Sequence, residues 1–128
     1  MRICSSARFS GSGRIEIGDH TYIGSEVLLR ASPGSCISIG SDCDIASRVL
    51  IWTGTHDVAT EGPRAAGPGK SEDVRVADGC WLGAGVIVNA GVKIGPRSVV
   101  ASGGVVVTDI ESQVLVAGVP AVVKKCLR

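Results

Sequence analysis

Aliphatic residues recur every six positions in four stretches of the chain. Each is usually followed by Gly or Ala, and a small or β-branched residue stands four positions after it. A helix repeats about every 3.6 residues and a strand every two, so neither produces this pattern. A six-residue repeat is typical of a parallel β-helix. The twelve aliphatic positions are Ile17, Ile23, Leu29, Ile39, Ile45, Ile51, Val76, Leu82, Val88, Ile94, Val100 and Val106.

The spacing of these positions predicts a triangular tube with three six-residue faces in each turn. Val76 and Ile94 are 18 residues apart, so their turns stack in phase, about 4.8 Å apart, as strands of a parallel sheet do. The first two repeats are 22 residues apart, which leaves four extra residues at a corner near 33–36. The step into Val76 is 37 residues long, so 19 residues, 57–75, leave the tube and return.

Composition agrees with a narrow core. Of the 128 residues, 45% are hydrophobic but only 3% are aromatic, as expected if one side chain from each face fills the interior and rings do not fit. We therefore expect residues 1–128 to form a single all-β domain, a parallel β-helix of about four to five coils. Its loop excursion spans 57–75 and its C-terminal tail spans 109–128. Residues 1–13 form either an irregular extra turn or none.

Charge and hydropathy restrict the possible partners. The formal net charge of +1 gives no field that would attract nucleic acid. No stretch approaches 18 consecutive apolar residues, and residues 1–12 lack a hydrophobic signal segment. We therefore expect no membrane insertion and a cytoplasmic location.

The five cysteines are an odd number and lack the spacing of a metal finger. In the predicted phasing Cys43 and Cys80 occupy the same slot on adjacent turns, between Thr21 and Ser98. We expect them to be stacked, reduced interior thiols; redox or metal chemistry is the alternative. No metal site is predicted.

One long stretch of the chain resembles the hexapeptide-repeat acyltransferases. The residues that carry the resemblance are CWLGAGVIVNAGVKIG at 80–95, VVASGGVV at 99–106 and the tail motif VAGVPA at 116–121. The resemblance covers about Ile15 to Lys125 and implies that the β-helix is left-handed. It is strongest to the sugar O-acetyltransferases, which include galactoside, maltose and exopolysaccharide acetyltransferases. It implies an acetyl-CoA-dependent O-acetyltransferase that forms a homotrimer with each active site between two subunits.

The candidate catalytic residue is His56, in the segment Thr53–Asp57 where the six-residue rhythm gives way to the excursion. Transfer of an acetyl group from a thioester to a hydroxyl needs a base, and imidazole suits that role near neutral pH. The resemblance assigns this role to His56, with direct attack by the acceptor. The alternative is a corner histidine that only caps the turn.

Two residues close to His56 in the sequence, and the second histidine of the chain, have alternative interpretations. Asp57 either orients the imidazole, binds the acceptor or is a solvated acid. Trp52 takes a slot usually given to Gly or Ala, four residues before His56, and is a candidate acceptor contact. His20 lies at an outward position and is expected to be a surface residue.

The candidate cofactor-binding residues follow mainly from the resemblance. Ala84 and Ser102, 18 residues apart, match positions that contact the pantetheine arm of CoA, although plain corner packing would also explain them. Trp81 is predicted to point outward and to meet CoA, the acceptor or a neighbouring subunit. Val107 and Thr108 replace a Thr-Lys pair of galactoside-type enzymes, so the cation near the CoA phosphates is expected from Lys125 or the adjacent Lys124.

The Asn and Asp that hold the sugar in galactoside-type enzymes fall near Gly24 and 32–34 of this chain, where neither residue type is present. This favours a nucleotide-sugar, polysaccharide or lipid-linked acceptor over galactoside or maltose. The excursion is expected to shape the acceptor pocket unless it is disordered. A serine- or drug-type acetyltransferase and a non-catalytic trimeric scaffold remain alternatives. A zinc carbonic anhydrase is strongly disfavoured, because it needs three histidine ligands per site and the chain has two histidines.

Overall fold

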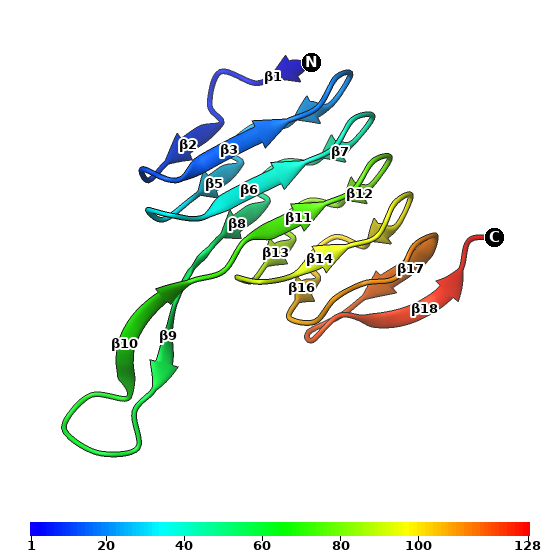
Figure 1. Ribbon diagram of the computed structural model, residues 1–128. Helices are drawn as coiled ribbons and strands as arrows, with labels where there is room; N and C mark the ends of the chain where they lie inside the picture. Colours follow the sequence, from blue (N-terminus) through cyan, green and yellow to red (C-terminus); the bar gives the residue numbers. More distant parts are fainter.

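A computed structural model describes residues 1–128 as strands and turns that wind into a triangular tube (Figure 1). Five coils stack along the tube axis and form three parallel sheets, here called faces A, B and C. The first four coils contribute a strand to each face, whereas the fifth coil contributes strands to faces A and B and meets face C only through the isolated bridge between Ile94 and Ile110. The chain contains no helix of the length and apolarity needed to cross a membrane.

The three faces are built from short strands in the order in which the coils stack. Face A consists of β1 (Arg2–Ile3), β4 (Tyr22–Ile23), β7 (Asp44–Ile45), β12 (Trp81–Leu82), β15 (Val99–Val100), β17 (Val114–Ala117) and the antiparallel β18 (Val122–Cys126). Face B consists of β2 (Arg8–Ser10), β5 (Leu28–Arg30), β8 (Leu50–Trp52), β13 (Ile87–Val88) and β16 (Val105–Val106). Face C consists of β3 (Arg14–Ile17), β6 (Cys36–Ile39), β11 (Val74–Val76) and β14 (Lys93–Ile94).

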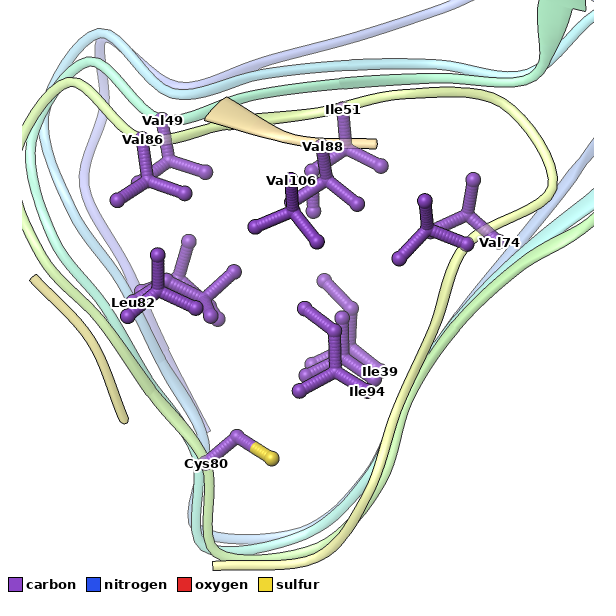
Figure 2. Packing of buried hydrophobic residues seen from close by; sticks show 14 of the residues in the cluster. Ile39, Val49, Ile51, Val74, Cys80, Leu82, Val86, Val88, Ile94 and Val106 are labelled. Carbon is purple, nitrogen blue, oxygen red and sulfur yellow. The ribbon is translucent and has the colours of Figure 1, made fainter. Parts of the chain in front are cut away.

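The six-residue rhythm forms the core as predicted. Eleven of the twelve aliphatic positions are buried, and Ile17, in the terminal first coil, is half-buried. Equivalent positions pair in register across coils; Val76, for example, lies between Ile39 and Ile94. Figure 2 shows Ile39 and Ile94 stacked along the tube axis.

The expectation of one inward side chain per face is wrong. Most faces bury two side chains, two residues apart, because alternate residues of a strand point to the same side. Val74 and Val76 are both buried on face C, and Val86 and Val88 are both buried on face B (Figure 2). The interior is therefore wider than one side chain per face requires, and it is filled mainly by aliphatic residues, with cysteine, threonine and serine at its corners.

The corner between faces C and A carries the stacked thiols that the sequence predicts. Cys43 and Cys80 are buried and free of disulfides. Their Sγ atoms donate to the carbonyl oxygens of Ala77 (3.2 Å) and Gly95 (3.1 Å) in the next coil. The hydrogen bond with Cys43 and burial raise the pKa of the Cys80 thiol. These two thiols thus act as buried donors that join successive coils.

The boundaries of the excursion and the tail differ from those predicted. The chain leaves the tube at Gly54 rather than 57, as the antiparallel hairpin of β9 (Gly54–Val58) and β10 (Ala66–Ser71). It rejoins the tube before 75, because the Val74 side chain is buried in the core. The predicted tail also begins inside the tube, where Ile110 is buried and bridges to Ile94.

The two remaining irregular segments both belong to the tube. The four extra residues near 33–36 form a turn at the corner between faces B and C, where Gly34 has a φ of 78°. Residues 1–13 form the first two faces of the first coil, because β1 pairs with β4 and β2 pairs with β5, and β3 completes it.

Candidate active site

His56 lies on β9, just after the chain leaves the B–C corner, and its ring is exposed. Its Nδ1 atom is 2.9 Å from the carbonyl oxygen of Gly67 on the opposite strand of the hairpin. A carbonyl oxygen only accepts hydrogen bonds, so Nδ1 carries the proton and donates it. The other ring nitrogen, Nε2, is then left with its lone pair free to accept a proton.

A β-bulge presents this carbonyl to the ring. Between Ala66 and Gly69, β10 uses one residue more than β9 does between Val58 and His56, and such an extra residue re-aims the local backbone. Gly67 also allows the two strands to approach closely, because a Cβ at this position would lie 2.8 Å from the Asp57 carbonyl oxygen. The bulge and the absent side chain together fix the orientation of the imidazole.

Asp57 does not orient the imidazole, which corrects one of the interpretations above. Adjacent residues of a strand point to opposite faces, so the Asp57 side chain lies on the side away from His56. Its carboxylate pairs with Lys70 Nζ at 2.8 Å, and Glu72 contacts the same ammonium at 3.4 Å. These hydrogen bonds to Asp57 and Glu72 raise the pKa of Lys70.

The His56 side of the hairpin is turned toward the second coil. Gly54 shares this side of β9, and a Cβ on Gly54 would lie 2.6 Å from Ser32 Oγ. Buried Thr53 fixes the root of the hairpin, since its Oγ1 accepts the Ser32 N–H (2.9 Å) and lies 2.6 Å from Ser35 Oγ. The imidazole is therefore carried on an arm whose base is bonded to the tube.

Trp52 precedes this root at the B–C corner, where its side chain is half-buried. The register of face B places Arg30 of the second coil beside it. Val107 occupies the equivalent slot on the fifth coil, since Val106 aligns with Val88 and Val88 with Ile51. Val107 and the adjacent Thr108 are exposed.

Ala84 and Ser102 lie at a different corner, between faces A and B. They stack on adjacent coils as predicted, with the Gly103 N–H donating to the Ala84 carbonyl oxygen (2.9 Å). Both residues are exposed. Their small side chains leave the polypeptide backbone accessible along this corner.

Trp81 and the tail lysines lie on the adjoining face A. The Trp81 side chain is 55% exposed, as predicted, on the outer side of β12. It borders a shallow cavity of about 330 Å³ together with Tyr22, Asp44 and Ala46. Lys125, on β18, pairs with Leu115 of β17, and both Lys125 and Lys124 are exposed.

One chain therefore carries two separate halves of the predicted site. His56, Trp52, Val107 and Thr108 gather at the B–C corner or on its hairpin, whereas Trp81, Ala84, Ser102 and Lys125 gather around the A–B corner and face A. Between them lies the outer side of face B, where one row of half-buried aliphatic residues follows the coils. This row, called the face B aliphatic row, consists of Leu28, Leu50, Ile87 and Val105.

Two features of this site were not anticipated from the sequence. The Gly67 carbonyl has no sequence signature, because any residue carries one and only the bulge aims it at His56. Arg30 was missed because its neighbour in space, Trp52, is 22 positions away in the chain. His20 was correctly expected at the surface, where its Nδ1 lies 3.7 Å from Asp42.

Comparison with known proteins shows which enzymes this chain resembles. No family model matches the chain. It is 38% identical over 89 residues to the galactoside O-acetyltransferase of Lactococcus lactis, covering 70% of this chain and 42% of that protein. It is 33% identical over 112 residues to the galactoside O-acetyltransferase of Escherichia coli, covering 88% of this chain and 54% of that protein. The chain thus spans about half the length of these curated relatives.

Solved structures of similar fold are acetyltransferases as well. A hexapeptide-repeat acetyltransferase from Vibrio cholerae, complexed with acetyl coenzyme A, is 29% identical with a TM-score of 0.80, covering 96% of this chain and 72% of that chain. A maltose O-acetyltransferase from Clostridium difficile 630 is 25% identical with a TM-score of 0.66, covering 94% of this chain and 71% of that chain. The chain matches these relatives in sequence and in the geometry of its coils, which confirms the predicted left-handed winding. The chain accordingly belongs to the hexapeptide-repeat acyltransferases that fold as left-handed parallel β-helices, and the relatives named here include sugar O-acetyltransferases.

Proposed function

We propose that this protein transfers an acetyl group from acetyl-CoA to a hydroxyl of a sugar or polysaccharide-precursor acceptor, with His56 as the general base. The observation that carries the proposal is the hydrogen bond from His56 Nδ1 to the Gly67 carbonyl, which leaves Nε2 as a proton acceptor on an exposed ring. The galactoside and maltose O-acetyltransferases among the similar proteins support the reaction class.

The chemistry follows from that tautomer. Nε2 takes the proton of the acceptor hydroxyl as its oxygen attacks the thioester carbonyl carbon. The tetrahedral intermediate then collapses, the C–S bond breaks, and the imidazolium returns its proton to the CoA thiolate. The products are the acetyl ester and free CoA, and the base is regenerated without an acyl-enzyme. A positioned base contributes about 10²- to 10⁴-fold to such a reaction.

The A–B corner fits the CoA donor. Ala84 and Ser102 leave room for a pantetheine arm to lie against the backbone, and a nearby N–H is suited to polarising the thioester oxygen. Exposed Trp81 offers an apolar contact, while Lys125 and Lys124 offer charge for the phosphates. Val107 and Thr108 would line the facing side of the same donor groove.

A homotrimer would bring the two halves of the site together. Within one chain, face B separates His56 from Ala84 and Ser102. In a three-fold assembly the B–C corner of one protomer meets the A–B corner of the next. The face B aliphatic row supplies apolar surface for that contact. The hairpin would then project over the neighbouring subunit and border the acceptor site.

Trp52 and the hairpin form the acceptor side of this site. Trp52 offers a flat apolar surface for a sugar ring beside the root of β9. Asp57 is left out of the acceptor site, because it is paired with Lys70 on the far side of the hairpin. We place the enzyme in the cytoplasm, where acetyl-CoA is available as the donor.

The decisive test compares His56→Ala with His20→Ala in an assay of thiol release from acetyl-CoA over a panel of saccharide acceptors. We expect His56→Ala to lower kcat by about 10²- to 10⁴-fold and to leave CoA affinity, measured by calorimetry, within about twofold. His20→Ala removes the other histidine and should behave as wild type.

Two outcomes would contradict the proposal. Wild-type kcat in His56→Ala would remove the general base. Absence of CoA binding in the wild-type protein would favour the non-catalytic scaffold. Turnover of serine or a drug-like amine or alcohol in preference to every saccharide would keep the chemistry but reassign the acceptor.

A further inference from the structure

Arg30 is an exposed cation at the B–C corner that has no carboxylate partner. Its only side-chain hydrogen bond runs from Nη1 to Ser10 Oγ, at 3.2 Å. Arg8 also lacks an acidic partner, and it lies diagonally across from Arg30 because Arg8 pairs with Leu28 and Ser10 with Arg30. The unpaired positive charge where the second coil meets the hairpin root is therefore that of Arg30.

The acidic residues nearest this corner are already engaged. Asp73 accepts the backbone N–H of Cys36 at 2.9 Å. Glu72 pairs with Lys70 on the side of the hairpin that faces away from His56. Glu16 pairs with Arg14 on face C. The guanidinium of Arg30 thus keeps its donors available to a ligand.

The position of Arg30 links it to the proposed acceptor site. It lies directly beside Trp52 in the parallel register of face B, and its carbonyl oxygen accepts the N–H of Thr53 at 3.2 Å. The His56 side of β9 faces this same coil, as the approach of Gly54 to Ser32 shows. A ligand lying on Trp52 would therefore have the Arg30 guanidinium on one side and the imidazole arm on the other.

We propose that Arg30 selects an acceptor that carries an anionic group, a carboxylate or a phosphate on a saccharide. This inference rests on the proposed acetyl transfer and names the class of its acceptor. A guanidinium binds both kinds of anion through paired N–H donors, and the neighbouring indole binds the apolar face of a sugar ring. Four residues of extended strand separate Trp52 from His56, roughly 13 Å. The anion is accordingly not on the sugar unit that is acetylated. It is the carboxylate of an adjacent sugar unit or an adjacent phosphate.

Three matched probes test the proposal: lactose, which is neutral, 3′-sialyllactose, which adds a carboxylate, and lactose 1-phosphate. Binding to the CoA-loaded protein is measured by calorimetry, and turnover is measured by thiol release at saturating acetyl-CoA. We expect at least one anionic probe to bind about tenfold or more tightly than lactose in the wild-type protein. The carboxylate and phosphate probes identify which anion is used.

The variants Arg30→Gln, Arg30→Lys and Arg97→Gln assign the effect. Arg30→Gln should abolish the preference by raising KM for the anionic probe about 10- to 100-fold, with kcat and the KM for acetyl-CoA within about twofold. Arg30→Lys should retain part of the preference, because it keeps the charge but loses the paired donors. Arg97 is an exposed arginine at the corner between faces C and A, so Arg97→Gln should match wild type.

The outcomes separate this inference from the proposed function. Equal binding of lactose and both anionic probes, or a preference that survives Arg30→Gln, would overturn the role of Arg30. A preference for anions that depends on Arg30 but comes without any thiol release would instead retain the subsite and contradict the acetyl transfer.

Discussion

At the scale of the residue, the orientation of one imidazole depends on one backbone carbonyl. The Gly67 carbonyl oxygen on β10 accepts the hydrogen bond from His56 Nδ1. The close approach of the Asp57 carbonyl oxygen leaves no space for a side chain at position 67. Gly67→Ala should shift the bulge, weaken the hydrogen bond and lower kcat about tenfold or more, since small misplacements of a catalytic group are costly. The KM for acetyl-CoA should stay within about twofold.

Gly69→Ala is the matched control for Gly67→Ala. A Cβ on Gly69 would lie 3.8 Å from His56 Cε1, an ordinary contact, so this variant should keep its activity. ¹⁵N chemical shifts of the His56 ring provide the direct measurement. They should report a single Nδ1–H tautomer in wild type and Gly69→Ala, and a tautomer mixture in Gly67→Ala. Equal loss of kcat in both variants would show that the hairpin is simply intolerant of substitution.

Thr53 gives a second prediction at this scale. Its hydroxyl accepts the Ser32 N–H and donates to Ser35 Oγ, because the Ser35 hydroxyl itself donates to the Ser32 carbonyl at 2.6 Å. Thr53→Val keeps the shape but leaves these polar groups unsatisfied, which should lower the free energy of unfolding by about 1–3 kcal/mol. Thr55→Val, two residues farther along the exposed hairpin, should change it by less than about 0.5 kcal/mol. Urea denaturation of the two variants measures the difference.

At the scale of the element, the hairpin is an addition that the tube does not need for its core. No residue from 54 to 73 is buried, whereas the flanking residues Thr53 and Val74 are both buried. The hairpin is held together by its own pairing, which continues to the Ala59 N–H and the Ala65 carbonyl oxygen at 2.7 Å. Its tip can therefore be changed without disturbing His56 or the coils.

Replacing residues 60–64 by Asn-Gly tests what the tip does. The Ala59–Ala65 hydrogen bond and the Gly67 bulge remain, and Asn-Gly suits a two-residue hairpin turn. We expect the melting temperature to change by less than about 2 °C and the KM for the acceptor to rise several-fold, with the KM for acetyl-CoA unchanged. A larger rise in the KM for acetyl-CoA than for the acceptor would place the tip over the donor instead.

Most of the tube was predictable from the sequence, because one aliphatic residue per face fixes the phase of every coil. The return of Val74 to the core was missed, since the prediction used a single inward position per face and Val74 occupies the second one. The hairpin was predicted only as an excursion, because residues 54–71 lack the alternating apolar pattern of a buried strand and pair through backbone groups. The contact between Gly67 and His56 was missed for the same reason. His56 could be singled out because it stands where the rhythm breaks.

At the scale of the whole molecule, the two halves of the proposed site lie on opposite edges of face B, so one chain would not hold a complete site. The face B aliphatic row joins them, and its side chains are half-buried although no other part of the chain covers them as a layer. The proposed trimer explains both features at once. Its interface must then be required for activity as well as for assembly.

Ile87→Glu tests this requirement at the centre of the row. A carboxylate placed in an apolar contact between protomers would be buried without a partner, so we expect dissociation to monomers by analytical ultracentrifugation and a loss of thiol release of about 10²-fold or more. The circular dichroism spectrum should stay unchanged, because the side chain points away from the core. Ser38→Glu introduces the same charge on the outer side of face C, next to Arg75 in the sheet register, and should stay trimeric and active. A wild-type protein that is monomeric and active would contradict the shared site, and so would an Ile87→Glu monomer with full activity.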